Sequence, residues 1–254
     1  MYVSKDLSAN EKGHLVINGA DTVELAQEFG TPLYVMDEDY IRENCREFRQ
    51  SIEKYYHGSG MVCYASKAFC CREMCRIANE EGIGIDAVSI GELYTAKSVS
   101  FPGEKICYHG NNKTAEELET AISYGVGRIV ADNPDELDLI NEVAEKLGKK
   151  QPVLLRLTPG IEAHTHAFIQ TGQIDSKFGM AIELGLAMKG VKKALSLPNL
   201  FLDGVHCHIG SQIFDIDPFV HAAEIMMEFI AKVRKELGYE IKTMNLGLKL
   251  WNML

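Results

Sequence analysis

Short apolar runs alternate along this chain with longer stretches that carry helix signals, and this alternation constrains the fold more than any other feature. The runs show little polar alternation, which indicates strands that are buried on both faces. They read PLYVM (32–36), MVCYA (61–65), GIDAVS (84–89), KICYHG (105–110), RIVAD (128–132), PVLLRL (152–157), DGVHCHIG (203–210) and TMNLG (243–247). A parallel sheet covered by helices buries such strands, so we expect an α/β fold.

Helix signals separate most of these runs. Thr114 and Glu117 predict a capping box for a helix that stops at Gly125. Asn133, followed by a proline, predicts the start of a second helix that ends at Gly148. Seven or eight strand–helix units, with no GxGxxG in the first, favour a (β/α) barrel over an open doubly wound sheet.

Composition excludes several classes of protein. The formal net charge of −10 argues against a broad basic surface for nucleic acid or anionic membrane. No apolar run approaches the roughly 18 residues that a membrane span requires. The first twenty residues carry charges and no signal-peptide core, so we expect a cytoplasmic protein.

The seven cysteines form no evident disulfide framework. Cys71 and Cys75 are four residues apart and could share a helix face, but no histidine or further cysteine follows at ligand spacing. We therefore expect free thiols in a reducing compartment and no metal site.

Polar residues gather where the predicted strands end, which in a (β/α) barrel is the face that carries the chemistry. They are Ser66, Lys67, Asp86, Ser89, His109, Asn111, Asn112, Asp132, Asn133, Arg156, His206, His208 and Ser211. We expect these side chains to converge on one barrel mouth.

Lys67 is the sharpest candidate because lysine is costly to bury without a partner. In a partly desolvated mouth its amine would be a nucleophile suited to an aldehyde. The alternative is a lysine whose long side chain extends from a strand end to solvent.

The segment HCHIGS, residues 206–211, is the second candidate. His206 and His208 alternate along a strand and therefore point the same way. They could bind a metal, stack on an aromatic cofactor, or be satisfied core histidines. Gly210 and Ser211 then open a turn that can hold phosphate. The long polar segment 156–180 predicts an ordered functional loop.

Together these segments resemble the fold-type III pyridoxal-phosphate-dependent decarboxylases, and within them the diaminopimelate decarboxylase branch. The resemblance runs from about residue 13 to Gly247. It rests on TPLYVMD, YASKAF, GIDAVSIGEL, HGNNKT, TPGIEAHTHAFIQTGQIDSKFG, GVHCHIGSQI and MNLG. The EAHTH and SKFG part separates this branch from the ornithine and arginine decarboxylases. The resemblance implies a (β/α)8 TIM-type barrel of the alanine racemase and ornithine decarboxylase type.

The same resemblance implies pyridoxal 5'-phosphate as cofactor and assigns residues to it. Lys67 matches the lysine that carries the cofactor, and His208 matches the histidine that stacks on its pyridine ring; these two are the expected catalytic residues. Ser211 and Gly247 match phosphate contacts. Asp86 and Arg156 match positions near the cofactor in the mouth.

The implied reaction removes CO2 from meso-2,6-diaminoheptanedioate and releases L-lysine, as a lyase of lysine biosynthesis. The expected partners are this small diamino dicarboxylic acid and, for the full-length family, a second copy in a homodimer. No nucleic acid or membrane partner is expected.

The resemblance also implies a domain division. Residues 1–30 match a segment that joins the family's β domain, 31–247 the cofactor-binding barrel, and 248–254 a divergent tail. The family's glycine run of type NLGGGFG reads NLGLKLWNML here. We therefore expect an incomplete barrel without its last strand and without the C-terminal β domain, and a chain that is catalytically incomplete. The alternative is a non-catalytic pyridoxal-phosphate-binding barrel or an interaction partner of a full-length decarboxylase.

Overall fold

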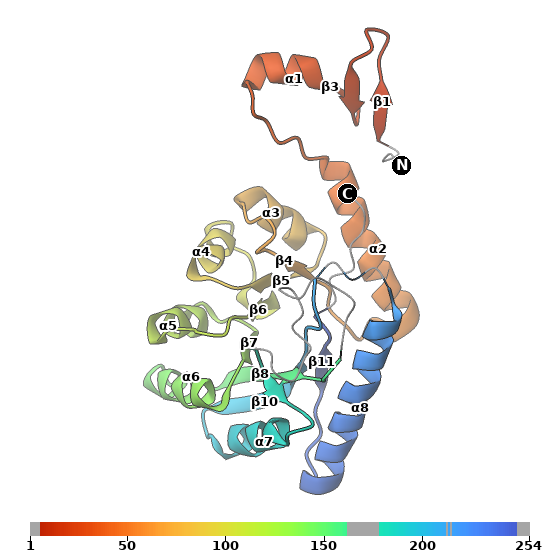
Figure 1. The fold of residues 1–254 in the computed structure, drawn as a ribbon. Helices are drawn as coiled ribbons and strands as arrows, with labels where there is room; N and C mark the ends of the chain where they lie inside the picture. Colours follow the sequence, from red (N-terminus) through yellow and green to blue (C-terminus); the bar gives the residue numbers. More distant parts are fainter. Residues whose placement is uncertain (1–5, 162–177, 212, 214, 248–254) are drawn as a thin grey trace. The chain divides into compact units, whose positions relative to one another are not determined.

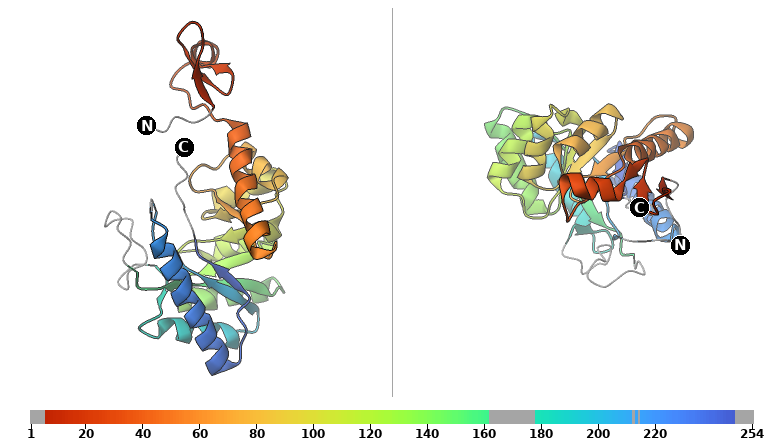
Figure 2. Two further views of the ribbon diagram at one scale, coloured as in Figure 1. Left: turned by 90° about the vertical axis from the view of Figure 1, so that its right-hand side faces the viewer. Right: turned by 90° about the horizontal axis from the view of Figure 1, so that it is seen from above.

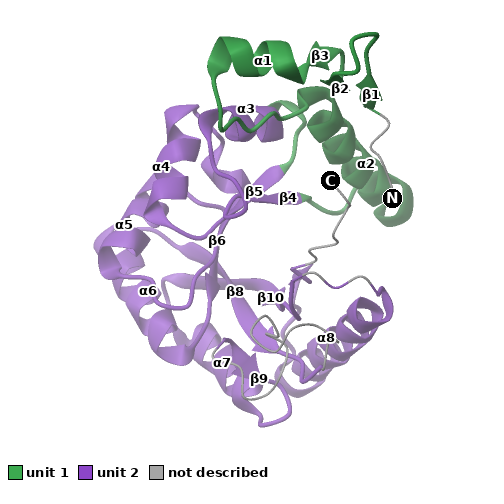
Figure 3. Cartoon of the chain, turned by 45° about the horizontal axis from the view of Figure 1, so that its top comes forward, with its two compact units in different colours: residues 1–62, 80–83, 253–254 green, residues 63–79, 84–252 purple. Residues whose placement is uncertain are grey.

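The computed structural model describes residues 6–161, 178–211, 213 and 215–247 of the chain. Among these, the chain divides into two compact units (Figure 3). Unit 1 holds residues 6–62 and 80–83, and unit 2 holds 63–79 and 84–247. The predicted boundary after residue 30 concerns the family's domains and stays a prediction.

Unit 1 begins with a small antiparallel sheet and continues into two helices. Its elements are β1 (Leu7–Ala9), β2 (Leu15–Ile17), β3 (Ala20–Asp21), α1 (Thr22–Phe29) and α2 (Glu38–Tyr56). The Asp21 carboxylate accepts hydrogen bonds from two backbone N–H groups of the first turn of α1. Asp37 caps α2 by accepting the backbone N–H of Tyr40, so each helix begins at an aspartate that satisfies free donors of its first turn.

Unit 2 contains the parallel sheet that the apolar runs predict. Its strands are β4 (Cys63–Ala65), β5 (Gly84–Ala87), β6 (Ile106–Tyr108), β7 (Arg128–Ala131), β8 (Gln151–Thr158), β9 (Met180–Ala181), β10 (Leu200–His206) and β11 (Thr243–Asn245). The order is β4-β5-β6-β7-β8-β10-β11, with β9 paired to the end of β8. Every pair in this sheet is parallel.

Helices connect these strands and cover the outer face of the sheet. They are α3 (Arg72–Glu80), α4 (Ile90–Ser98), α5 (Ala115–Tyr124), α6 (Pro134–Lys146), α7 (Leu186–Ser196) and α8 (Asp217–Leu237), with a short 3-10 turn at Gly103–Lys105. Figures 1 and 2 show the sheet curled, with α3 to α7 following one another around its outside. None of the helices in the described ranges is long and apolar enough to cross a membrane.

The curled sheet confirms the predicted incomplete (β/α) barrel. Within the described residues the sheet ends on β4 at one side and on β11 at the other. Cys107, Val130 and Leu154 form a buried apolar cluster on three neighbouring strands, β6, β7 and β8. Polar side chains follow two residues further along each of these strands, at their carboxyl ends.

The predicted caps are confirmed. Thr114 and Glu117 form the capping box of α5, and Gly125 ends that helix in the left-handed conformation. Asn133 caps α6, with its proline in the first turn.

The predicted strand at residues 32–36 is wrong. These residues are irregular and exposed, and they join α1 to α2. Within the described part of the chain no strand pairs with them, so apolar character alone did not produce a strand. The short strands of the N-terminal sheet and β9 were not predicted from the apolar runs.

Candidate functional site

The carboxyl ends of the parallel strands bring several predicted residues to one edge of the sheet. Arg156 on β8 lies opposite His206 on β10 in the parallel register. Nη1 of Arg156 lies 3.5 Å from the carboxylate of Asp132, which follows β7. Burial raises the pKa of Asp132, although Arg156 opposes this shift. The site therefore holds charged groups in largely desolvated positions.

The turn that carries Lys67 is anchored by its neighbour. Ser66 is buried, and its hydroxyl donates to the backbone oxygen of Asp86 at 2.9 Å and to Glu92 at 2.5 Å. Glu92 also accepts the backbone N–H of Val88 at 3.0 Å. The start of the turn is thus held by β5 and α4, the elements beside β4.

Lys67 itself is exposed, which corrects the expectation of a partly desolvated amine. The physical reason is the position of β4 at the end of the sheet, where β5 is its only strand neighbour within the described residues. No hydrogen bond or ion pair joins Lys67 to another described residue. Its amine is accessible to solvent and to an incoming aldehyde.

His208, Ser211 and Gly247 come together although 39 residues separate the first from the last. Nδ1 of His208 lies 2.8 Å from the backbone oxygen of Gly247 and donates to it, which fixes the ring. Nε2 then faces the Ser211 hydroxyl at 3.5 Å. The backbone N–H of Gly247 donates to the side chain of Asn245 at 2.9 Å.

Gly247 allows this approach because it has no side chain. Its φ of 55° lies in the left-handed region. A Cβ atom there would lie 2.5 Å from the backbone oxygen of Cys207 and 3.2 Å from Cβ of His208. Only glycine fits this contact without displacing the end of β10.

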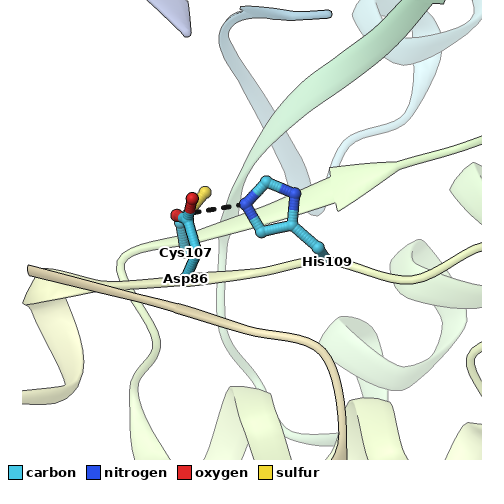
Figure 4. Close-up of side chains that lie close together, drawn as sticks. All are labelled: Asp86, Cys107 and His109. Carbon is cyan, nitrogen blue, oxygen red and sulfur yellow. Dashed lines mark ion pairs between the residues drawn. The ribbon is translucent and has the colours of Figure 1, made fainter. Parts of the chain in front are cut away.

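Asp86 on β5 and His109, directly after β6, form a half-buried pair. Oδ1 of Asp86 lies 3.2 Å from Nε2 of His109 (Figure 4). Burial alone would lower the pKa of His109, but Cys107 and the Asp86 carboxylate outweigh it and raise this pKa to about 10. The imidazole of His109 is therefore expected to be protonated at neutral pH in the free chain.

His206 contacts His109, but its pKa is shifted in the opposite direction. The two rings meet edge to face, with centroids 4.9 Å apart. Burial first, and then the nearby cations His109 and Arg156, place the pKa of His206 well below its ordinary value. A neutral imidazole thus stands beside a charged one.

Two anchoring interactions were missed by the sequence reasoning. Glu92 is three residues after Ser89, which is a capping-box spacing and therefore a signal that could have been used. The buried Lys113 donates to the backbone oxygens of Gly110 and Val130 and bonds Glu136. No local signal predicts that this lysine reaches α6 rather than solvent.

Most of the predicted functional loop, residues 162–177, lies outside the described residues. Its described end contacts the site, because the Arg156 guanidinium lies 4.4 Å from the ring centre of Phe178. Asn111 and Asn112 are exposed in the loop after β6. Ser89 and Asn133 cap α4 and α6 through their side chains.

Comparisons with known proteins agree with this geometry. Residues 38–248 match the family model for pyridoxal-dependent decarboxylases, pyridoxal binding domain. The chain is 50% identical over 247 residues to diaminopimelate decarboxylase of Bacillus methanolicus, and 44% identical over 250 residues to that of Bacillus subtilis. These matches cover 97% of this chain but 57% and 56% of the relatives, so the chain spans little more than half their length.

A solved structure has the same fold. The crystal structure of diaminopimelate decarboxylase from M. jannaschii in complex with L-lysine aligns with a TM-score of 0.86 at 38% identity. The alignment covers 96% of this chain and 57% of that one.

Proposed function

The chain belongs to the pyridoxal-dependent decarboxylases, and from this premise we propose that it is the cofactor-binding barrel of a diaminopimelate decarboxylase. The cofactor is pyridoxal 5'-phosphate. The proposed reaction converts meso-2,6-diaminoheptanedioate into L-lysine and CO2. The substrate assignment is supported by the names of the relatives and by the L-lysine bound in the M. jannaschii enzyme.

One observation carries the cofactor proposal, namely the convergence of His208, Ser211 and Gly247. Nδ1 of His208 is bound to the Gly247 oxygen, so the imidazole is oriented before any ligand arrives. The close backbone approach at Gly247 leaves no room for a Cβ atom. These features fit a flat ring against His208 and a phosphate near Ser211.

The buried polar atoms of the site also fit such a ligand. Nδ1 of His206 has no hydrogen-bond partner among the described residues, and Oδ1 of Asp132 has only the ion pair with Arg156 at 3.5 Å. Leaving buried polar atoms unpaired costs free energy, which a polar ligand or water in this space would recover. Arg156 adds a cation on the same edge.

Each residue then has a distinct role. Lys67 would attach the cofactor through its exposed amine, on a turn that Ser66 holds in place. His208 would orient the ring, and Ser211 and the chain at Gly247 would hold the phosphate end. When bound, pyridoxal phosphate supplies an electron sink for the electron pair that CO2 leaves behind. Asp86 and Arg156 would bind polar groups at the edge of the ring.

We also propose that the full-length protein works as a homodimer in the cytoplasm. The dimer follows from the resemblance to the full-length family. The seven cysteines are free in the structure, which is typical of a reducing compartment.

The proposal is tested by adding pyridoxal phosphate to the purified chain and recording the visible absorbance spectrum. We expect a cofactor band that is lost in Lys67→Ala and kept in Lys189→Ala, which removes an exposed lysine of α7. A band that survives Lys67→Ala would contradict the role of Lys67.

A second measurement separates a catalyst from a chain that only holds the cofactor. CO2 release from meso-2,6-diaminoheptanedioate is measured after the chain has been loaded. Because the chain spans 57% of its B. methanolicus relative, we expect loading without turnover. Turnover by this chain alone would contradict the expectation that further segments of the relatives are needed.

A further inference from the structure

Three chemically different side chains of unit 2 meet at two adjacent strands: Asp86 is on β5, Cys107 is on β6, and His109 directly follows β6 (Figure 4). Asp86 on β5 lies directly opposite Cys107 on β6 in the parallel register. His109 follows Cys107 by two residues and therefore lies on the same side of its strand. The strands, rather than a mobile loop, fix the starting points of these side chains.

The spacing of the donor atoms fits a metal ion. One carboxylate oxygen of Asp86, Sγ of Cys107 and one ring nitrogen of His109 all lie within 4.8 Å of one another. Two nitrogen or oxygen ligands at about 2.0 Å from a tetrahedral ion are about 3.3 Å apart. Oδ1 of Asp86 and Nε2 of His109 lie 3.2 Å apart.

These two atoms do not satisfy each other as a hydrogen-bonded pair. Both are buried, and within the described ranges neither has a hydrogen-bond partner of acceptable geometry. An ion pair at this distance normally aligns into a hydrogen bond, because an unpaired buried polar atom is costly. Once Nε2 has lost the proton that it carries at neutral pH, its lone pair and one of the Asp86 carboxylate can both be directed at a third atom.

We propose that Asp86, Cys107 and His109 bind a divalent cation of the zinc class, with the fourth coordination position open. A thiolate, an imidazole and a carboxylate are ligands that suit Zn²⁺ or Co²⁺ and not Mg²⁺ or Ca²⁺. Binding releases the Cys107 thiol proton to solvent, together with any proton on Nε2 of His109.

This inference does not depend on the proposed function. No compact motif in the sequence indicates this site, because 20 residues lie between Asp86 and its spatial neighbour Cys107. Asp86 is also a proposed cofactor contact, so the test uses the chain free of pyridoxal phosphate.

Co²⁺ is the probe, since tetrahedral Co²⁺ with a thiolate ligand gives intense visible bands and a near-ultraviolet charge-transfer band. We expect both to saturate at one equivalent and to disappear when Zn²⁺ is added. Cys107→Ser should abolish the charge-transfer band and weaken Co²⁺ binding at least tenfold. Asp86→Asn, which keeps the side-chain shape, should weaken binding to a similar degree.

The matched control is Cys207→Ala, which removes another buried thiol of the same unit. It should keep both bands at one equivalent, and circular dichroism should show that every variant is folded. If Cys107→Ser does not fold, the proposal is tested by comparing the Co²⁺ affinity of Asp86→Asn with that of the wild type. Absence of a saturable band in wild type, a band that survives Cys107→Ser, or unchanged affinity in Asp86→Asn would each overturn the proposal.

Discussion

At the scale of single residues, Gly247 is constrained both by its backbone conformation and by the space around it. Its left-handed φ would strain any other residue, and a Cβ atom would meet the backbone oxygen of Cys207 at 2.5 Å. Two independent constraints therefore coincide at the residue that orients His208.

Gly247→Ala is expected to destabilise the chain by more than the roughly 1–2 kcal/mol that a left-handed conformation alone costs. It should also weaken loading with pyridoxal phosphate, because the shifted backbone oxygen no longer orients His208. Urea unfolding and the absorbance titration measure the two effects. Gly148→Ala is the matched control, since φ is 61° there and nothing lies within 4 Å of the added Cβ. Equal losses of stability in the two variants would show that the close contact of the added Cβ with the backbone oxygen of Cys207 does not lower the stability further.

Lys113 is the second residue whose partners fix part of the site. It is buried, bonds Glu136 on α6, and donates to the backbone oxygen of Gly110 at 2.8 Å, next to His109. Lysine is mostly an exposed residue in proteins. Here Lys113 is buried and anchors the loop after β6.

Lys113→Met should destabilise the chain by about 3–5 kcal/mol, because it leaves the Glu136 carboxylate buried without its cation. Adding Glu136→Gln should restore part of this loss, since the amide oxygen can still accept the N–H of Asp132. Urea denaturation of the wild type and the two variants is the measurement. A double variant that is less stable than Lys113→Met would contradict the account.

At the scale of elements, arginines of helix α2 bind residues 80–83, and the Glu81 carboxylate accepts hydrogen bonds from two of them. Arg46 donates to Glu81 at 2.6 and 2.7 Å, and Arg42 adds a bond at 2.9 Å. The hydrogen bonds from Arg46, and then those from Arg42, lower the pKa of Glu81 although burial opposes them.

A depressed pKa gives this pair a definite pH dependence. The stabilisation is fully present above the ordinary value of 4.5 and is lost as the pH falls through the lower value of the folded state. We expect the unfolding midpoint of the wild type to fall below pH 4.5 more steeply than that of Glu81→Gln. Parallel pH profiles for the two proteins would contradict the assignment.

The elements also show how far the sequence can be interpreted by itself. The caps at Thr114 and Asn133 were predicted because their signals are local. The strand predicted from the apolar run at 32–36 is absent, since a strand also needs a neighbour to pair with. The contacts of Gly247 with His208 and of Asp86 with His109 bring together segments of different strands. Only the order and curl of the sheet set such contacts. The sequence therefore predicted that these residues converge at the carboxyl ends of the strands, but not which of them contact one another.

At the scale of the whole molecule, the described sheet is an open curl of parallel strands. Edge strands β4 and β11 each have a free side within the described residues, and α8 exposes Val220 and Met227. Unpaired strand edges and exposed apolar side chains favour association with further polypeptide.

We propose that Lys67 attaches pyridoxal phosphate at the carboxyl edge of this sheet. The most direct test is to load the chain with the cofactor, reduce it with borohydride, digest it and locate the modified lysine by mass spectrometry. The account predicts a single reduced pyridoxyl group on Lys67 at near-stoichiometric yield, and none on that peptide in Lys67→Ala. Label spread over several surface lysines, with Lys67 no more modified than Lys189, would contradict it.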